Sequence, residues 1–373
     1  MSSRRSRFPS TARRKSGQTS AAASRPGFAG GGTRLFPWGF APNPKPAPAG
    51  LLVPLAGRYL AKLLPSGTSA LLGLVAASTL TSSSDARAQA CCAGGSAITP
   101  ARLELLEFAL VGLEAKAGGV SGSWDLEGHA LALPRGAHEA DLEQDAFGAM
   151  RVLGRGQVAL LVPLIETWRE AGTQSEFGGG LGDINASLRY DLTLAGVSRV
   201  VPGVAVLGGV TIPTGRPADA SNLGALATGA TGIGAWQLNF GIAIEQVFGP
   251  WLFNLTGLVA ERTARTVGRG DTAVHEQLAP QWTGLVAAAY TFSSGWAVAL
   301  SAAYAFEGEA TIDDTRTPDS RHALPTLTLS TLVPLNGFWR LQIAVYDNPL
   351  VSQLGLNQAA AAGGSLTVIH SWM

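Results

Sequence analysis

The feature that most constrains this chain is a pair of long alternating segments between Thr231 and Thr263. In the first segment single small or polar residues separate the large apolar ones, so the apolar side chains share one face of an extended strand. These apolar residues are Trp236, Leu238, Phe240, Ile242 and Ile244. Phe248-Gly249-Pro250 turns the chain, and the pattern returns in Trp251, Phe253, Leu255 and Val259. Each segment is about twelve residues long, whereas ordinary strands average about six, so the pair is typical of a hairpin from a transmembrane barrel.

The composition is compatible with a membrane protein that crosses by strands. The chain of 373 residues is 46% hydrophobic and only 14% charged. No stretch reaches the roughly eighteen uninterrupted apolar residues that a membrane-spanning helix requires. In a barrel the apolar residues alternate with polar ones, which explains an apolar average without an apolar run.

The charges are divided unevenly along the chain. Residues 1–90 hold twelve Lys and Arg and a single acid, whereas residues 91–373 hold fifteen Lys and Arg and twenty-five Asp and Glu. The second part therefore carries about ten net negative charges. We do not expect nucleic acid as a partner, because binding to phosphate requires a positive surface.

The segment that precedes this acidic part has the organisation of a secretory signal. Arg58 and Lys62 form a basic start, and the apolar stretch Ser69–Thr81 is too short to span a membrane. Ala88-Gln89-Ala90 supplies a cleavage site of the A-x-A type. The predicted organisation is a disordered or misannotated extension at 1–57, a signal peptide at 58–90, a periplasmic segment at 91–103 and a barrel at 104–373.

Cys91 and Cys92 are the only cysteines, and they would open the mature chain. Lipidation of Cys91 would favour a leucine three residues earlier, where Ala88 stands. A metal site is less compatible still, because the pair lacks a nearby histidine. We interpret the pair as part of a processed terminus with free or intermolecularly paired thiols, and lipidation as the alternative.

Alternating segments recur along the chain and predict twelve strands. Besides the two strands of the opening hairpin they are Glu107–Trp124, Leu142–Leu153, Gln157–Trp168, Asp183–Thr193, Val201–Thr214, Gln281–Phe292, Trp296–Glu307, Ala323–Leu335, Trp339–Tyr346 and Gly364–Trp372. The links after the second, fourth, sixth, eighth and tenth strands are short, and the others run about ten to twenty residues. An even strand count with tight periplasmic turns and longer external loops is typical of outer-membrane barrels. We therefore predict an all-β fold, a transmembrane antiparallel up-and-down β-barrel of about twelve strands.

Aromatic residues near the strand ends favour the same fold. They are Trp168, Trp236, Trp251, Trp282, Trp296, Trp339, Tyr290 and Tyr304. In a barrel they would form girdles at the two membrane interfaces. The alternative, a soluble sandwich with these residues in its core, would leave no polar face for water.

Three short motifs carry a resemblance to a known family. They are GGGLGDINASLRYDL at 178–192, VTIPTG at 210–215 and ATGIGAWQLNFG at 230–241. With them the chain resembles outer-membrane barrel transporters associated with the meta-pathway of phenol degradation, which are distantly similar to long-chain fatty-acid transport barrels. The matching features are Gly182-Asp183 before a strand that closes on Arg189-Tyr190, the strand end Pro213-Thr214-Gly215, and a strand start at Gly232 and Gly234.

This resemblance covers residues 150–260 and extends to the remainder only by pattern. It implies uptake of small hydrophobic or aromatic molecules across the outer membrane of a Gram-negative bacterium. The expected partners are outer-membrane lipid, such a solute and the barrel-assembly machinery. That machinery reads a terminal aromatic residue in outer-membrane barrels, whereas here Trp372 is followed by Met373.

Charged residues on the inward faces of the predicted strands are the candidate site. They are Glu143, Asp145, Arg151, Asp183, Arg189, Asp191, Glu245, Glu307 and Arg340. One interpretation is a substrate-selecting ring in the lumen. The other is that they pair across neighbouring strands and fill a narrow barrel. The many inward Ala, Gly, Ser and Thr leave space, which favours a pore.

Signals of catalysis or metal binding are scarce. The five histidines, which show no metal-ligand spacing, are His129, His138, His275, His322 and His370. The sequence contains no G-x-S-x-G motif, and its Gly-rich segments lead into strands rather than into the helix that a phosphate loop needs. We expect no enzymatic activity, no cofactor and no bound metal.

Two functions follow from these observations. The first is an outer-membrane transporter or channel for small hydrophobic or aromatic molecules. The alternative is a closed structural or receptor-like barrel that acts through its external loops at 214–231 and 263–279. An open or a filled lumen would distinguish them.

Overall fold

A computed structural model describes residues 102–220, 223–268 and 273–373 of the chain. The predicted extension, the signal peptide, and Cys91 with Cys92 lie outside the described residues. Among the described residues, no helix is long and apolar enough to cross a membrane.

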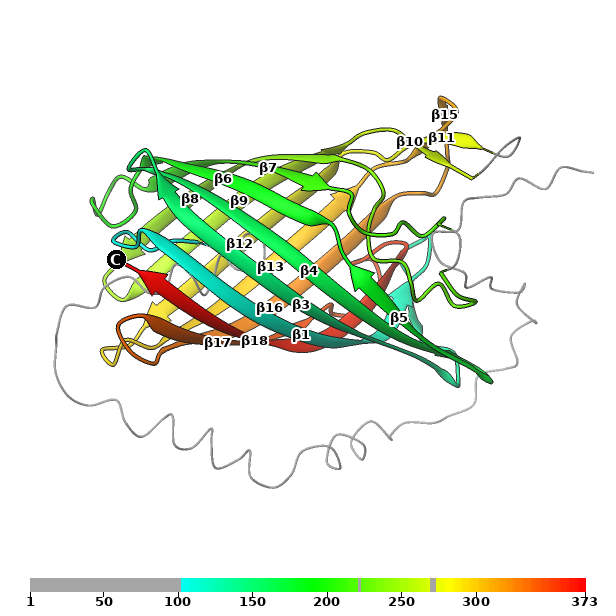
Figure 1. Cartoon of the computed structure of the whole chain (residues 1–373), viewed down its shortest axis with the longest axis horizontal. Helices are drawn as coiled ribbons and strands as arrows, with labels where there is room; N and C mark the ends of the chain where they lie inside the picture. The colour runs from blue at the N-terminus through cyan, green and yellow to red at the C-terminus, as the bar shows by residue number, and fades with distance from the viewer. Residues whose placement is uncertain (1–101, 221–222, 269–272) are drawn as a thin grey trace, which may run out of the picture. The chain divides into compact units, whose positions relative to one another are not determined.

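Twelve long antiparallel strands form a closed barrel (Figure 1). In order around the barrel they are β1 (Ala109–Trp124), β3 (Ala137–Val152), β4 (Gly156–Ala171), β6 (Ile184–Thr193), β7 (Gly203–Ile212), β8 (Gln237–Phe248), β9 (Trp251–Arg262), β12 (Gln281–Thr291), β13 (Ala297–Glu307), β16 (His322–Pro334), β17 (Trp339–Asp347) and β18 (Gln358–Trp372). The ladder between β18 and β1 runs from Ala109↔Trp372 to Trp124↔Gln358 and closes the sheet. Closure leaves no unpaired strand edge in hydrocarbon, where each unsatisfied backbone group costs several kcal/mol. The predicted fold is confirmed.

The two ends of the barrel differ. At the turn end, on the left of Figure 1, lie the C-terminus and compact connections such as the β8–β9 turn at Gly249. At the loop end, on the right, six short strands extend the barrel or join its loops. They are β2 (Ala130–Ala132) beside β1, β5 (Gln174–Leu181) beside β4, and the separate sheet of β10 (Arg265–Val267), β11 (Val274–Gln277), β14 (Thr311–Ile312) and β15 (Thr315–Arg316).

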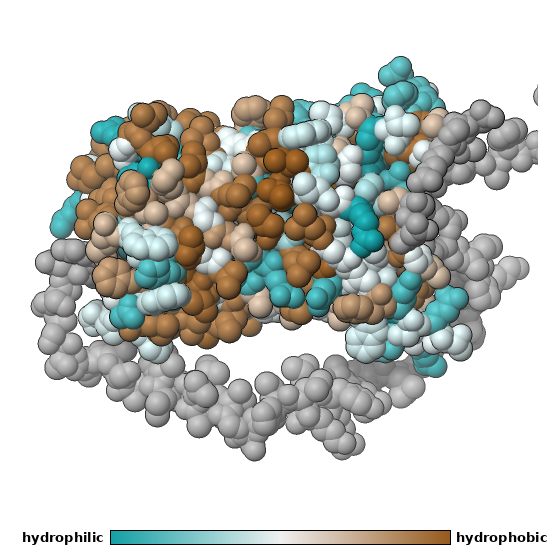
Figure 2. All heavy atoms as spheres, in the orientation of Figure 1, coloured by the Kyte–Doolittle hydropathy of each residue, from teal (hydrophilic) through white to brown (hydrophobic). Residues whose placement is uncertain are grey.

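The period-two pattern separates an apolar outer face from a small and polar inner one. On β8 the side chain of Phe240 is 55% exposed and that of Ile242 is 53% exposed, whereas the inward Ala243 and Glu245 are 1% and 2% exposed. Figure 2 shows apolar side chains over the left and middle of the barrel, while hydrophilic ones gather toward the loop end. A continuous apolar face of this width would be unfavourable in water. It is the lipid-facing belt of a transmembrane barrel.

The outward tryptophans fall into two groups along the barrel. Trp168, Trp236 and Trp282 lie near the loop end, and Trp251, Trp296 and Trp339 lie near the turn end. Tyr290 packs edge-on against Trp251, with ring centroids 5.0 Å apart. The two groups form the aromatic girdles of the barrel, because amphipathic rings are favoured at the two membrane interfaces.

One predicted connection is wrong. Strand β4 does not end at Trp168 but continues to Ala171, where a turn at Gly172 (φ 63°) returns the chain as β5. Strands β5 and β6 then follow one another along β4, separated only at Gly182-Asp183. The Gly-rich end of β5 lacks the large alternating side chains that mark a strand, so the sequence pattern missed it.

A second connection was predicted to be short and is not. Residues 194–202 join β6 to β7 at the turn end, outside any strand. Pro202 has no N–H to give to a ladder, so pairing starts only at Gly203. The strict alternation of short turns and long loops is therefore broken at two adjacent links, although the barrel still closes with twelve strands.

Candidate functional site

The inward faces form the candidate site, and their charged residues gather in separate groups. We name three of them. The turn-end cluster is Arg102, Glu104, Glu107, Arg151, Arg189, Asp191, Glu245 and Arg340. The wall cluster is Glu114, Lys116, Asp141, Glu143, Asp145 and Tyr346, and the mouth hub is Gln237, Arg262, Gln281 and Glu307.

The turn-end cluster surrounds a segment of the chain that enters the barrel. Residues 102–108 precede β1, and Leu103 is 5% exposed in an inward apolar group formed with Leu110, Phe147, Ala149 and Ile369. The backbone N–H of Leu103 donates to Oε1 of Gln157 on β4, at 2.9 Å. A backbone segment in a lumen needs such partners, because its polar groups have left water.

Arg340 on β17 fixes this segment through two carboxylates. Its Nη1 lies 2.5 Å from Oε1 of Glu104 and 2.7 Å from Oε1 of Glu107. Arg340 is 5% exposed and Glu107 is 3% exposed. Arg151 adds a hydrogen bond from its Nε to the Glu107 carbonyl at 2.9 Å. Guanidinium groups suit this role because they bind several acceptors in fixed directions.

Glu245 on β8 holds the other side of the segment. It forms ion pairs with Arg102 and, at 3.3 Å, with Arg189 on β6. Arg189 also lies 2.8 Å from Asp191, and Nδ2 of Asn254 donates to Glu245 at 3.1 Å. The five predicted candidates Arg151, Arg189, Asp191, Glu245 and Arg340 therefore meet around the entering segment. The last four form ion pairs, whereas Arg151 donates to the backbone carbonyls of Glu104 and Glu107.

The wall cluster contains the predicted candidates Glu143 and Asp145. Lys116 on β1 pairs with Glu143 at 3.3 Å and lies 5.3 Å from the centre of the Tyr346 ring. Glu114 stands directly opposite Asp145 in the β1–β3 ladder. Asp145 is 7% exposed, and among the described residues its Oδ1 has no hydrogen-bond partner.

Asp183 holds a loop in place. It lies in the break between β5 and β6, where it accepts hydrogen bonds from two backbone N–H groups far apart in the sequence. Oδ1 accepts from Gly215 at 2.8 Å, and Oδ2 accepts from Ile233 at 2.7 Å. Asp183 therefore ties together the two ends of the loop between β7 and β8. We name the described parts of this loop, residues 213–220 and 223–236, the tied loop.

The three motifs of the family resemblance meet at this tie. The hydroxyl of Thr214 donates to the Gly182 carbonyl at 2.6 Å, and that of Thr231 donates to the Leu181 carbonyl at 2.7 Å. A Cβ on Gly232 would lie 2.4 Å from Oδ1 of Asp183, so only glycine fits there. The motifs are distant in sequence, and the barrel makes them one structural unit.

The mouth hub is centred on Arg262, which the sequence analysis missed. Its Nη1 lies 2.5 Å from Oε2 of Glu307, its Nε donates to Oε1 of Gln237 at 2.9 Å, and its Nη2 donates to Oε1 of Gln281 at 2.7 Å. These partners come from β13, β8 and β12, so one guanidinium on β9 links four neighbouring strands of the barrel wall. Every second residue of β9 after Asn254 and Thr256 points inward, so the same alternation would have identified Arg262 as an inward charge.

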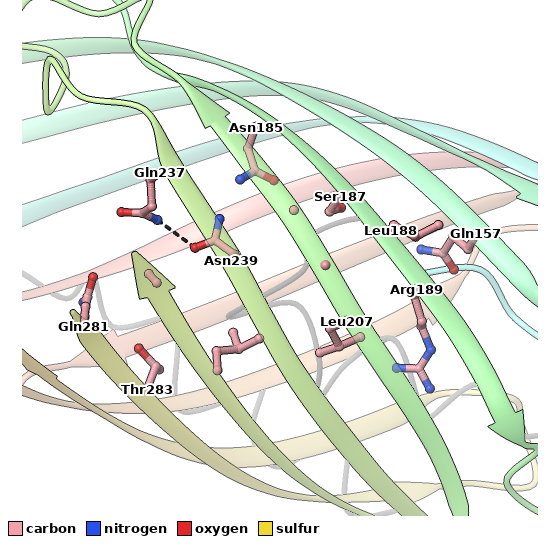
Figure 3. Close-up of a pocket in the computed structure, with 14 residues that line it drawn as sticks. Gln157, Asn185, Ser187, Leu188, Arg189, Leu207, Gln237, Asn239, Gln281 and Thr283 are labelled. Carbon is pink, nitrogen blue, oxygen red and sulfur yellow. Dashed lines mark hydrogen bonds between the residues drawn. The ribbon is translucent and has the colours of Figure 1, made fainter. Parts of the chain in front are cut away.

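Two cavities remain between these groups. The mouth cavity, of about 310 Å³, is lined by Arg262, Glu307 and Gln281 with Gly232 and Ile233 of the tied loop. The lumen cavity, of about 270 Å³, is lined by Arg189 and by amide and hydroxyl side chains of β4, β6, β8 and β12 (Figure 3). Gln281 lines both cavities, so the mouth hub lies where they meet.

One carboxylate–histidine group has its potential ligand atoms close together. The ligand atoms of Asp125, Glu127 and His129 all lie within 4.8 Å of one another beyond the end of β1. The two oxygens of Asp125 already bond within the group, to the backbone and Nδ1 of His129. These three residues form a local turn on the exposed loop, and none of them lines either cavity.

Comparisons with known proteins agree with the fold. No family model and no curated protein matches the sequence. The structure is similar to that of an outer membrane channel from Pseudomonas putida F1, with a TM-score of 0.58 and 14% identity over 71% of this chain and 96% of that one.

Two further solved structures are more loosely similar. The CymD monoaromatic hydrocarbon channel has a TM-score of 0.39 and 9% identity over 75% of this chain and 93% of that one. The translocator domain of the autotransporter NalP from Neisseria meningitidis has a TM-score of 0.37 and 10% identity over 72% and 89%.

Proposed function

We propose that this transmembrane barrel is an outer-membrane channel for small molecules, with the mouth and lumen cavities as successive stations on its path. The observation that carries the proposal is the pair of cavities, about 310 and 270 Å³, that meet at Gln281 inside a closed barrel. A purely structural barrel would gain from filling this space, since packed side chains stabilise an interior. The similarity to an outer membrane channel concerns the fold alone.

The proposed setting is the outer membrane of a Gram-negative bacterium. The turn end and the C-terminus would face the periplasm, and the loop end would face the outside. Lipid would surround the apolar belt, and the barrel-assembly machinery would insert the chain. That the protein is not an enzyme stays a prediction.

The proposed solutes are small hydrophobic or aromatic molecules, as the family resemblance implies. The walls of the two cavities include apolar side chains suited to such a solute, among them Leu207 and Leu258 in the lumen cavity and Leu278 and Leu324 in the mouth cavity. The nine predicted candidates remain a hypothesis about selectivity, with the direct contribution expected from Arg189 and Glu307, which border a cavity.

The turn-end cluster would then act as the last barrier. Residues 102–108 lie inside the barrel there, held by Arg340 and Glu245. A solute that leaves the lumen cavity toward the periplasm would have to pass or displace this segment. Ion pairs allow such displacement more readily than a covalent link, because each charge can return to water when it leaves its partner.

The test is single-channel recording and solute uptake with the purified mature chain in bilayers. We expect discrete conductance steps and solute uptake above that of protein-free vesicles. Deletion of residues 102–107 should enlarge the steps, because it removes the turn-end barrier. Silent bilayers and no uptake, with the intact chain and with the deletion, would overturn the proposal.

A closed receptor-like barrel is the second candidate, and one observation favours it. The turn end is occupied by buried charges, including Glu245 at 2% and Arg340 at 5% exposure. If that occupation were permanent, ligands would act only at the loops around 214–231 and 263–279. Binding that persists in a silent barrel and disappears on loop deletion would identify this function.

A further inference from the structure

The lumen cavity has a lining that is unusual in its chemistry. Five side chains carry primary amides and two carry hydroxyl groups: Gln157, Asn185, Gln237, Asn239 and Gln281, with Ser187 and Thr283. Figure 3 shows these side chains along β4, β6, β8 and β12, where Gln237 bonds Asn239 on the same strand. Each of these groups both donates and accepts hydrogen bonds. The lining therefore offers both kinds of partner to a solute.

Some hydrogen-bond donors and acceptors of this lining are not used by the protein itself. Oε1 of Gln281 accepts from Arg262, and Nδ2 of Asn185 donates to Thr211 at 3.0 Å. Among the described residues, Nε2 of Gln281 and Oδ1 of Asn185 have no partner. One donor on β12 and one acceptor on β6 are thus available to a molecule in the cavity.

The charge at this cavity is already compensated. Arg189 is the charged side chain in its lining, and it lies 2.8 Å from Asp191 and 3.3 Å from Glu245. A charged solute would lose its hydration without gaining a counter-ion, which costs more than the transfer of a neutral polar group. The lining therefore favours uncharged solutes.

Apolar surface completes the site without an aromatic ring. Leu207 and Leu258 contribute side chains, and Gly209 leaves its part of the wall free of one. Within residues 102–220, 223–268 and 273–373, the lining of this cavity contains no Phe, Tyr or Trp. A solute without polar groups would leave the amides facing apolar surface, at a cost of about 1–3 kcal/mol for each unsatisfied group.

We propose that the lumen cavity is a binding station for a small uncharged solute that carries several hydroxyl or carbonyl groups. This inference rests on the proposed channel function, but it departs from the solute class that the family resemblance implies, because the amides of this station favour uncharged polar molecules over hydrophobic ones. The cavity of about 270 Å³ has room for one ring-sized molecule. Hydrocarbons and organic acids pass this station less readily.

The test compares two ring solutes of similar size in vesicles that contain the protein. The probes are myo-inositol, which is uncharged, and quinate, which carries a carboxylate. We expect inositol to enter at least about fivefold faster than quinate. Gln281→Leu should slow inositol entry about fivefold, because one hydrogen bond is worth about 1 kcal/mol. Gln246→Leu is the matched control, since this β8 amide bonds the 198–199 backbone instead of the cavity.

Several outcomes overturn the inference. Equal entry of the two solutes would do so, and so would a Gln281→Leu barrel that behaves like Gln246→Leu, while ion conductance in either case leaves the channel proposal intact. Asn239→Leu tests the same lining if Gln281→Leu does not fold, as judged by a heat-dependent shift on gels, and normal inositol entry in it overturns the inference. No conductance and no entry of either solute would overturn the channel proposal and this inference together.

Discussion

Replacing Asp183 by alanine removes the tie between the two ends of the tied loop. The substitution deletes the acceptors for the N–H groups of Gly215 and Ile233. A hydrogen bond to a charged group is worth about 1.5–3 kcal/mol, and the lower figure applies because Asp183 is only half-buried. Two such bonds give about 3 kcal/mol, which corresponds to roughly a hundredfold increase in the population with an undocked loop.

Hydrogen exchange followed by mass spectrometry measures this population directly. In Asp183→Ala the amides of Gly215 and Ile233 should exchange roughly a hundredfold faster, whereas amides of the barrel strands should be unchanged. Asp183→Asn keeps one neutral acceptor and should give an intermediate increase, about tenfold. Asp347→Ala is the matched control, because this carboxylate is exposed at the same end of the barrel.

The outcome that refutes this reasoning is equally definite. If Asp183→Ala exchanges like Asp347→Ala, the loop is held by its other contacts. These include the Leu226 N–H to Glu176 at 2.5 Å and the Arg169 Nη1 to the Leu226 carbonyl at 2.9 Å. Asp183 would then have no positioning role, and the mouth cavity would keep its tied-loop wall without it.

Three further predictions test the lumen and the belt. Arg340→Gln should enlarge single-channel conductance, because the entering segment loses its two carboxylate contacts; unchanged conductance would mean that the segment is not the barrier. Arg262→Ala should merge the two cavities and shift reversal potentials toward cations, since Glu307 loses its partner, and an unchanged potential would contradict this role of the mouth hub. Phe240→Lys on the outer face should lower the free energy of unfolding in lipid by about 2–4 kcal/mol in urea titrations, whereas the inward Asn239→Lys should lower it less. Equal losses would contradict the assignment of faces.

Local alternation was sufficient to predict the strands and the lipid-facing side. For the opening hairpin, β12 and β17, the predicted strand bounds agree with the observed bounds to within a few residues. The start of β18 was missed because Gln358–Gly364 contains only small residues and one Gln, which do not alternate in size. The hairpin at Gly172 was missed for the same reason, since the returning strand β5 ends in glycines.

The groupings inside the barrel depend on the tertiary structure. Alternation says that a residue points inward, but the register between strands decides which inward residues meet. Arg102 reaches Glu245 across 143 residues of sequence, and Arg340 reaches Glu104 across 236. Nine inward charges were predicted from the sequence. Closure of the barrel brings five of them together around the entering segment, and the carboxylate of Asp183 binds the two ends of the tied loop.

The sequence by itself therefore determined that this protein spans a membrane as a barrel. Apolar residues that face lipid alternate with small or polar residues that face the lumen, and this alternation is visible in the sequence. Only the tertiary structure decided which inward residues line the two cavities inside the barrel. Stagger and closure bring distant strands together, and they place Arg262, Gln281 and the tied loop around the two cavities. Such contacts depend on sequence separations that no local pattern encodes.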